Sequence, residues 1–234
     1  MRLHRFIGKY NLTGKKVEIT DFEEVNQMRS VLRLKKGDKI VLADGKGQEA
    51  EVILESFNEN KILGTVNKNY PARTPLAGFR NVHLYLAILK KENFELAVQK
   101  AVECGIASIT HIITERTIKT GLNMERLQKI IKEASEQCGR STLPELFDIF
   151  DFTEAINSQA DEKIIFHTDE ETANYQPNKK ANSVNIFVGP EGGFTPNEIE
   201  LAKNSGFTPA SLGGLTLRGE TAAIIGAYRA MHAI

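Results

Sequence analysis

The chain has 234 residues, 41% of them apolar and 26% charged, and its 30 basic residues balance 30 acidic ones. This length and composition suit one large domain or two smaller ones with a sizeable core, and they exclude a disordered, collagenous or low-complexity protein. No stretch approaches the roughly 18 uncharged apolar residues that a membrane span needs, and the N-terminus has no signal-peptide run. Cys104 and Cys138 are far apart, so we expect two reduced thiols in a cytoplasmic protein.

The charges are unevenly distributed along the chain. Residues 1–72 hold 13 Lys or Arg and 10 Asp or Glu, whereas residues 73–234 hold 17 and 20. The excess is largest in residues 1–39, with 10 basic and 5 acidic side chains. A basic N-terminal region is compatible with contacts to nucleic-acid phosphates, although ordinary scatter over a solvated surface would give the same counts.

The N-terminal part of the sequence predicts a small β-barrel. Short segments rich in β-branched residues are expected as strands: Val17–Thr20, Lys39–Ala43, Gln48–Leu54 and Ile62–Val66. Residues 44–47, Asp-Gly-Lys-Gly, predict a hairpin turn. Apolar spacing predicts one helix over Phe22–Leu32, with Asp21 as its N-cap and Glu24 at the capping-box position.

A proline-containing linker separates this part from the rest of the chain. Pro71 and Pro75 mark a boundary, so we expect one domain over residues 1–72 and a second over residues 73–234. After the linker, strands are predicted at Val82–Leu89, Ser108–Ile113, Lys163–His167 and Val184–Val188. Helices are predicted at Glu92–Cys104, Met124–Cys138, Asp151–Ser158, Pro196–Asn204 and Glu220–Met231. This alternation predicts an α/β domain with a largely parallel sheet.

Two glycine-rich loops follow predicted strands. The first, Gly189–Phe194, leads into a helix start with Thr195 as N-cap and Glu198 completing a capping box. The second, Ser211–Thr221, opens the last helix. Ligands of open α/β sheets bind at the carboxyl ends of the strands, so the two loops are the candidate binding site. The scattered histidines lack metal-ligand spacing and no serine occupies a nucleophile elbow, which disfavours a metal site and a hydrolase.

The motifs in these loops resemble those of the RsmE family. They are Gly-Pro-Glu-Gly-Gly-Phe at 189–194, Leu-Gly at 212–213 and Leu-Arg-x-Glu-Thr-Ala at 217–222. Further matching motifs lie at 31–38, 99–105, 115–116 and 133–140, so the resemblance covers nearly the whole chain. Leu215 and Gly219 depart from the family, which often has Arg at the first position and another small residue at the second.

The resemblance implies an S-adenosylmethionine-dependent methyltransferase of the SPOUT superfamily. Such an enzyme methylates ring nitrogen 3 of a uridine in small-subunit (16S) ribosomal RNA. The implied fold is a C-terminal α/β domain with a deep trefoil knot whose loops form the cofactor pocket, preceded by a PUA-like RNA-binding β-barrel. The implied enzyme is a homodimer with its active site at the subunit interface, and it uses no metal.

The resemblance and the chemistry of methyl transfer together nominate three sets of residues. The cofactor-binding candidates are Val188, Gly189, Pro190, Glu191, Gly192, Gly193, Leu212, Gly213, Leu217 and Thr221. The catalytic candidates, which would stabilise the uracil anion or accept its proton, are Arg218, Glu220, Arg140 and Gln137. The candidate phosphate contacts are Arg2, Arg5, Arg29, Arg33, Lys35, Lys36 and Arg116.

Two other functions remain compatible with the sequence. One is a catalytically inactive, ribosome-associated RNA-binding factor that keeps the knotted pocket, and the other is a methyltransferase acting on another RNA nucleotide. The presence together of Glu191, Arg218, Glu220 and Thr221 favours the enzyme. The substrate is either free ribosomal RNA or an assembled subunit. The last predicted helix is apolar around most of its circumference, which suits burial against a second subunit.

Overall fold

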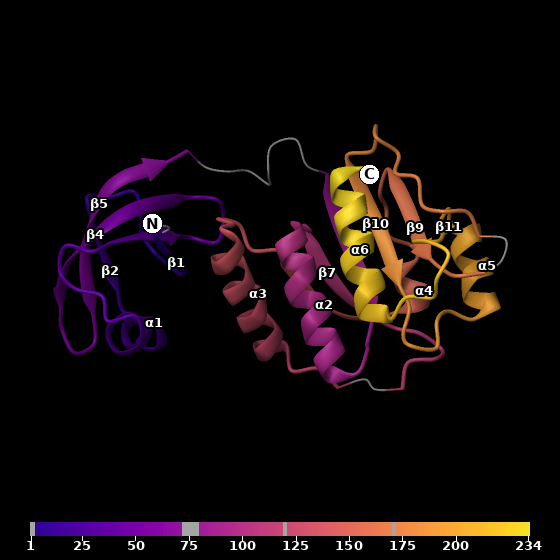
Figure 1. Ribbon diagram of the computed structural model, residues 1–234, viewed down its shortest axis with the longest axis horizontal. Coiled ribbons are helices and arrows are strands. Elements are labelled where there is room, and N and C mark those ends of the chain that lie inside the picture. Colours follow the sequence, from indigo (N-terminus) through magenta and orange to yellow (C-terminus); the bar gives the residue numbers. More distant parts are fainter. Residues whose placement is uncertain (1–2, 72–79, 119–120, 170–171) are drawn as a thin grey trace. The chain divides into compact units, whose positions relative to one another are not determined.

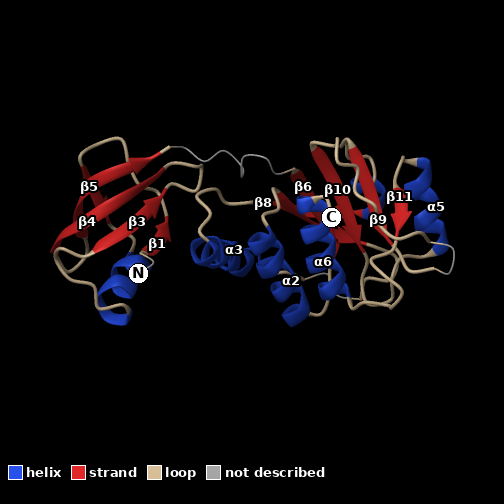
Figure 2. Cartoon of the chain, turned by 45° about the horizontal axis from the view of Figure 1, so that its top comes forward, coloured by secondary structure: helices blue, strands red, loops and turns tan. Residues whose placement is uncertain are grey.

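The computed structural model describes residues 3–71, 80–118, 121–169 and 172–234. Its contacts divide the chain into two compact units, and each is described by itself (Figures 1 and 2). The first unit contains residues 1–77 and 135–143, and the second contains residues 78–134 and 144–234. The predicted boundary at residues 72 and 73 lies outside the described residues. The sequence did not predict that the short segment 135–143 would make its contacts in the first unit.

The first unit is a five-stranded sheet. Its strands are β1 (His4–Ile7), β2 (Lys16–Ile19), β3 (Lys39–Ala43), β4 (Glu49–Phe57) and β5 (Ile62–Tyr70), in the order β1-β3-β4-β5-β2. Strand β1 pairs in parallel with β3, and the other pairs are antiparallel. The four predicted strands are confirmed. Strand β1 was not predicted because four residues with two charged or polar side chains give no readable alternation.

Local hydrogen bonds explain the turn and the helix of this unit. In the β3–β4 hairpin, Asp44 Oδ1 accepts from the backbone N–H groups of Lys46 (2.7 Å) and Gln48 (3.0 Å). Asp21 caps the helix, because its Oδ1 accepts from the N–H of Glu24 at 3.0 Å. The helical segment ends one residue before the predicted Leu32, but it is not α-helical throughout: α1 (Phe22–Asn26) passes into one π-helical turn, η1 (Gln27–Val31).

The second unit is built on a six-stranded sheet in which every pairing is parallel. Its strands are β6 (Asn81–Ala87), β7 (Ser108–Ile113), β8 (Glu145–Asp151), β9 (Glu162–Phe166), β10 (Ser183–Val188) and β11 (Thr208–Ala210), in the order β11-β9-β10-β6-β7-β8. The predicted α/β class is therefore correct. The two strands that the sequence did not predict, β8 and β11, are the sheet's edges, where burial on both faces does not impose an apolar run.

Helices cover both faces of this sheet (Figure 1). They are α2 (Lys91–Cys104), α3 (Met124–Cys138), α4 (Phe152–Ala155), α5 (Pro196–Asn204) and α6 (Gly219–His232). One face packs Leu84, Leu86 and Ile186 against α2, α6 and the first part of α3. The other face packs Phe187 and Ile112 against α4 and α5. Figure 1 shows α2 and α6 side by side, the pair of helices in closest contact.

Helix α6 is buried on one side and partly open on the other. Ala223, Ala227 and Ala230 are buried, whereas Ile224 is half-buried and Tyr228 is 48% exposed. A single chain therefore does not cover the whole apolar circumference that the sequence predicts.

Among the described residues, no helix is long and apolar enough to cross a membrane. After β10 the chain passes β9 and forms β11 on its far side, and α6 follows. This strand order does not by itself establish the trefoil knot, which stays a prediction.

Candidate active site

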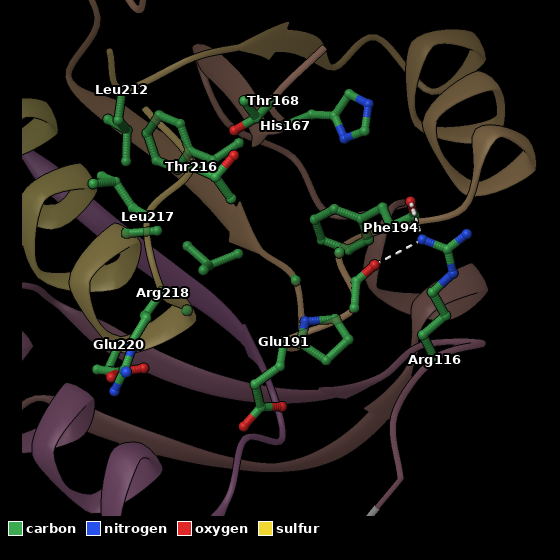
Figure 3. A pocket seen from close by; sticks show the side chains of 18 of the residues that line it. Arg116, His167, Thr168, Glu191, Phe194, Leu212, Thr216, Leu217, Arg218 and Glu220 are labelled. Atoms are coloured by element: carbon green, nitrogen blue, oxygen red, sulfur yellow. Dashed lines mark hydrogen bonds between the residues drawn. The ribbon is translucent and has the colours of Figure 1, made fainter. Parts of the chain in front are cut away.

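A cavity of about 680 Å³ opens at the carboxyl ends of three neighbouring strands of the second unit (Figure 3). The last residues of β9, β10 and β11, which are Phe166, Val188 and Ala210, all line it. Because the strands are parallel and adjacent, the segments that follow them converge on one edge of the sheet. Both glycine-rich loops predicted from the sequence belong to these segments and line the cavity.

The first loop forms a tight turn that favours glycine. Gly193 has φ +66°, and its N–H donates to the Pro190 carbonyl at 2.8 Å. A Cβ atom on Gly189 would lie 3.2 Å from the ring of Phe194. The predicted capping box at the start of α5 is confirmed: Thr195 Oγ1 accepts from the Glu198 N–H (3.3 Å), and Glu198 Oε2 accepts from the Thr195 N–H (2.8 Å).

Glu191 connects this loop to the start of α2. Its Oε1 accepts a hydrogen bond of 3.0 Å from the backbone N–H of Lys90, the N-cap residue of α2. A carboxylate in this position favourably faces the positive end of the helix dipole. Glu191 is exposed and lines the cavity, as do Lys90 and Asn93.

Arg116 reaches the same loop from the segment after β7. Its Nη1 donates to the carbonyl oxygens of Gly192 (2.7 Å) and Phe194 (3.5 Å), as the dashed lines in Figure 3 show. Arg116 was predicted to contact RNA phosphates. The structure places it in the lining of the cavity in the second unit, whereas the other predicted RNA contacts belong to the first unit.

The second loop is shaped by Ser211, which is buried. Ser211 Oγ donates to the Gly213 carbonyl (2.7 Å) and accepts from the Gly213 N–H (3.2 Å). Leu212 and Leu217, two of the cofactor-binding candidates, line the cavity. Gly213 instead lines a neighbouring polar hollow, and Thr221, which is half-buried on α6, does not line the cavity.

Three of the charged side chains that line the cavity lie on the same side of it. In Figure 3, Glu191, Arg218 and Glu220 lie on one side, and Leu212, Thr216 and Thr168 lie on the opposite side. Arg218 is exposed, and in the described part of the chain its side chain makes no hydrogen bond or ion pair. Glu220 is only 8% exposed, and its Oε2 is buried without a hydrogen-bond partner among the described residues.

The other two catalytic candidates are not in this cavity. Gln137 and Arg140 belong to segment 135–143 of the first unit, where Gln137 is exposed and Arg140 is half-buried. Arg140 Nε donates to the Thr142 carbonyl at 3.1 Å. Arg218 and Glu220 therefore line one cavity of the second unit, whereas Gln137 and Arg140 belong to the first unit and do not line it. A catalytic role for the latter pair stays a prediction.

The predicted RNA contacts of the first unit differ in how available they are. Arg5 forms an ion pair with Glu49, whose side chain is 2% exposed, so this guanidinium already has a buried partner. Arg29 donates to the carbonyls of Asn58 (3.0 Å) and Glu59 (3.1 Å). The remaining described candidates are exposed: Arg33, Lys35 and Lys36. Arg2 lies outside the described residues.

Several lining residues were missed by the sequence analysis. Phe166 ends β9, His167 and Thr168 follow it directly, and Lys90 and Asn93 stand at the start of α2. The signal for the first three was present, since their strand was predicted and the rule that ligands bind at carboxyl strand ends applies to it equally. They were overlooked because the segment carries no glycine motif.

Comparisons with known proteins agree with this architecture. A family model for an RNA methyltransferase domain matches residues 78–231, and one for an RNA methyltransferase PUA domain matches residues 19–67. The chain is 32% identical to ribosomal RNA small subunit methyltransferase E of Rickettsia conorii, covering 94% of this chain and 91% of that protein. It is 28% identical to the protein of the same name from Bacillus subtilis, covering 86% and 84%.

Solved structures are similar over nearly the whole chain. A ribosomal RNA small subunit methyltransferase E from Neisseria gonorrhoeae bound to S-adenosyl methionine superposes with a TM-score of 0.87 at 28% identity, covering 97% of each chain. A methyltransferase from Legionella pneumophila in complex with the same cofactor superposes with a TM-score of 0.84 at 30% identity, covering 97% of this chain and 96% of that one.

Proposed function

The chain belongs to the ribosomal RNA small subunit methyltransferase E family, and from this membership we propose that it methylates ring nitrogen 3 of a uridine in 16S ribosomal RNA. It is an S-adenosylmethionine-dependent methyltransferase of small-subunit ribosomal RNA. The proposed location of the active site rests on one observation: three adjacent strand ends and both glycine-rich loops line a single cavity.

The residues of the cavity fit S-adenosylmethionine, which supplies an electrophilic methyl group when bound. The volume of the cavity, about 680 Å³, lies within the usual range for small-molecule sites. Leu212, Leu217 and Val188 offer apolar surface for the faces of adenine. Gly189 and Gly193 leave the loop backbone bare, so its amides and carbonyls can meet the polar edges of the cofactor. The buried, unpartnered Oε2 of Glu220 is a polar atom that a bound ligand can satisfy.

Arg218 is the proposed stabiliser of the uracil anion. Ring nitrogen 3 of uridine carries a proton at neutral pH, and its lone pair becomes available only when that proton leaves. The negative charge then spreads onto the two ring carbonyl oxygens. The exposed guanidinium of Arg218 has no protein partner among the described residues, so it is free to donate to one of these oxygens.

Glu220 is the proposed acceptor of the proton. Its carboxylate lines the cavity on the same side as Glu191 and Arg218, and no described group hydrogen-bonds to its buried oxygen. A purely structural role competes with this proposal, because Glu220 is also an acidic residue in the first turn of α6, where it favours the helix dipole. The pH dependence of a variant separates the two roles, as argued in the Discussion.

We also propose that the enzyme is a homodimer in which Gln137 and Arg140 act at the cavity of the other subunit. Ile224 is half-buried and Tyr228 is exposed on α6, which supports burial of this side of the helix against a second copy of the chain. Light scattering at micromolar concentration tests the dimer. A mixed dimer of Arg218→Ala and Arg140→Ala chains tests the sharing, because one of its two sites is intact only if Arg140 acts across the interface. Activity no higher than that of either parent variant would exclude sharing.

The first unit is proposed to hold the RNA. It carries the match to an RNA methyltransferase PUA domain, and the exposed Arg33, Lys35 and Lys36 supply positive charge. A ribosomal RNA substrate, free or within an assembled subunit, also implies a cytoplasmic location.

Mass mapping of ribosomal RNA tests the function as a whole. RNA from cells lacking the gene should lack one methyl group on a 16S uridine, and the purified protein with S-adenosylmethionine should restore it. A missing methyl group on another base would overturn the proposed target. Cofactor binding without any transfer to subunits or free RNA would instead indicate a catalytically inactive RNA-binding factor.

A further inference from the structure

The segment after β7 forms a tight turn beside the first glycine-rich loop. The N–H of Thr114 donates to Thr117 Oγ1 at 3.0 Å, and the N–H of Thr117 donates to the Thr114 carbonyl at 3.0 Å. The turn therefore has a fixed shape of its own. It presents Glu115 and Arg116, the two residues between the threonines, toward the loop and the start of α5.

Glu115 fixes this turn to the beginning of α5. Its backbone N–H donates to Glu198 Oε1 at 2.9 Å, and its carboxylate accepts from Thr195 Oγ1 at 3.2 Å. Thr195 and Glu198 are the two members of the capping box, and both are buried. The turn is thus held against the start of α5. Arg116, the next residue in the turn, projects from this fixed position.

Arg116 extends from this anchor across the loop itself. Its Nη1 donates to the carbonyls of Gly192 and Phe194, at 2.7 and 3.5 Å. Its stem lies against Gly192, where an added Cβ atom would be 3.3 Å from Arg116 Cδ. The glycine at 192 therefore makes room for the arginine side chain.

We propose that Arg116 is a positioning residue that holds the first glycine-rich loop in its cofactor-binding conformation, an inference that rests on the proposed cofactor cavity. A loop with glycine at 189, 192 and 193 loses much conformational freedom when it is ordered, and these three positions have no side chains to restrain it. Hydrogen bonds from a charged donor to two loop carbonyls restrain it from outside. The ordering is then completed before the cofactor arrives, which strengthens binding.

This role differs from a contact with RNA phosphate. A phosphate contact needs only a positive charge, and lysine supplies one as well as arginine does. Both loop carbonyls are reached by one atom, Arg116 Nη1. This nitrogen lies one bond further from the backbone than the Nζ of a lysine, so lysine falls short of the pair of carbonyls. The two roles therefore predict opposite behaviour for the conservative variant.

Calorimetry with S-adenosylmethionine on the full-length protein, without RNA, tests the proposal. We expect Arg116→Ala to raise Kd for the cofactor about tenfold, the loss typical of one charged hydrogen bond. Arg116→Lys should remain impaired. Steady-state assays of Arg116→Ala should show a raised KM for the cofactor, with kcat at saturating cofactor near the wild-type value. RNA affinity should be unchanged, because the guanidinium of Arg116 is bound to the loop carbonyls. Thermal stability should change little, because Arg116 is exposed.

Arg126→Ala is the matched control. Arg126 is also an exposed arginine of the second unit, but it pairs with Glu95 and does not line the cavity. Its loss should leave cofactor affinity unchanged. Wild-type cofactor affinity in Arg116→Ala, full recovery in Arg116→Lys, or weaker RNA binding with normal cofactor binding would each overturn the inference. If the wild-type protein failed to bind the cofactor, the proposed function itself would be refuted.

Discussion

The guanidinium of Arg218 is exposed in the cavity, whereas the carboxylate of Glu220, two residues further along the chain, is buried at its edge. In the described part of the chain, no ion pair or hydrogen bond joins these two side chains, and neither has another such partner. Side chains two positions apart at the start of a helix do not face each other, so the sequence spacing alone does not pair them. Both side chains remain available to a ligand. Substituting either one breaks no contact of the other.

Substitution of Arg218 should separate catalysis from cofactor binding. Arg218→Ala is expected to lower kcat by ~10²-fold or more, the loss typical of one preorganised electrostatic donor. Cofactor affinity should change little, because loop backbone and apolar side chains provide most of that recognition. Methylation assays with calorimetry in parallel measure both. A variant with normal kcat would exclude Arg218 as the stabiliser of the anion.

Glu220→Gln distinguishes a proton acceptor from a helix-start residue. If Glu220 accepts the proton, the rate should fall sharply at neutral pH and recover partly at high pH, where uridine ionises unaided. If it only favours the helix dipole, the variant should lose about 1 kcal/mol of stability or less and keep its rate. The pH–rate profile decides, and Glu200→Gln on the exposed side of α5 is the control. A profile like that of the wild type would remove Glu220 from the catalytic residues.

Sequence patterns predicted the elements that have strong local signals. Helix α5 has a proline, a capping threonine and Glu198, and its bounds are those predicted. The edge strands β8 and β11 were missed, since β11 has only three residues, one of them Pro209, and edge positions need not alternate. Gly219, a departure from the family pattern, is explained by packing: a Cβ atom there would lie 2.8 Å from Leu89. Such long-range proximity leaves no trace in local spacing.

The site was predictable only in part for the same reason. The glycine-rich loops were found because their motifs are continuous in sequence. The grouping of segment 135–143 with the barrel depends on contacts distant in sequence, in which the N–H of Ile7 donates to Glu136 Oε1 (2.8 Å) and the N–H of Gly47 donates to the Ser141 carbonyl (3.1 Å). Deleting residues 1–72 would therefore strip partners from this segment, so point substitutions test RNA binding more cleanly than truncation.

The exposed lysines of the first unit should control the salt dependence of RNA binding. The double variant Lys35→Ala/Lys36→Ala removes two exposed charges. The slope of log affinity against log salt should become shallower by about 1.5, because each phosphate contact contributes about 0.7–0.9. Cofactor affinity should be unchanged. The control is Lys16→Ala/Lys61→Ala, which removes the same charge from the same unit; equal slopes for the two double variants would contradict the assigned RNA contacts.

His111 should make the second unit sensitive to acid. It is fully buried in β7 beside the ring of Phe94 (5.2 Å between centroids), and in the described structure neither ring nitrogen has a hydrogen bond of normal geometry. Burial lowers the pKa of His111 to about 4, against smaller opposing effects of the Phe147 backbone and Asp148. The unfolded chain therefore takes up the proton first.

The sign of the effect follows from that lowered pKa. Stability is complete above the unfolded pKa near 6.5 and falls as the pH drops toward 4. At pH 5 the loss should be about 2 kcal/mol relative to pH 7.5, and His111→Leu should not show it. Urea unfolding at the two pH values measures the difference. An identical pH dependence in both proteins would exclude His111 as its source.

Gly226 should connect the packing of α6 to the cofactor cavity. A Cβ atom at this buried position would lie 2.4 Å from Cε2 of Phe166, whose ring packs edge-on against Tyr175 and lines the cavity. Gly226→Ala should therefore displace Phe166. Overpacking costs about 1–3 kcal/mol and the gain in helix propensity returns up to about 1 kcal/mol, so we expect a net loss of stability together with weaker cofactor binding.

A second substitution shows whether the clash with Phe166 is the cause. Phe166→Leu removes the ring atoms that the new methyl group would meet, so the double variant should be more stable than the sum of the two single losses predicts. Gly214→Ala is the control, because a Cβ atom there meets nothing within 4 Å and its φ is not in the positive range. Thermal unfolding and calorimetry with S-adenosylmethionine measure the two effects. Strictly additive losses would place the strain elsewhere on α6, and unaltered cofactor affinity in Gly226→Ala would mean that the cavity tolerates a shifted Phe166.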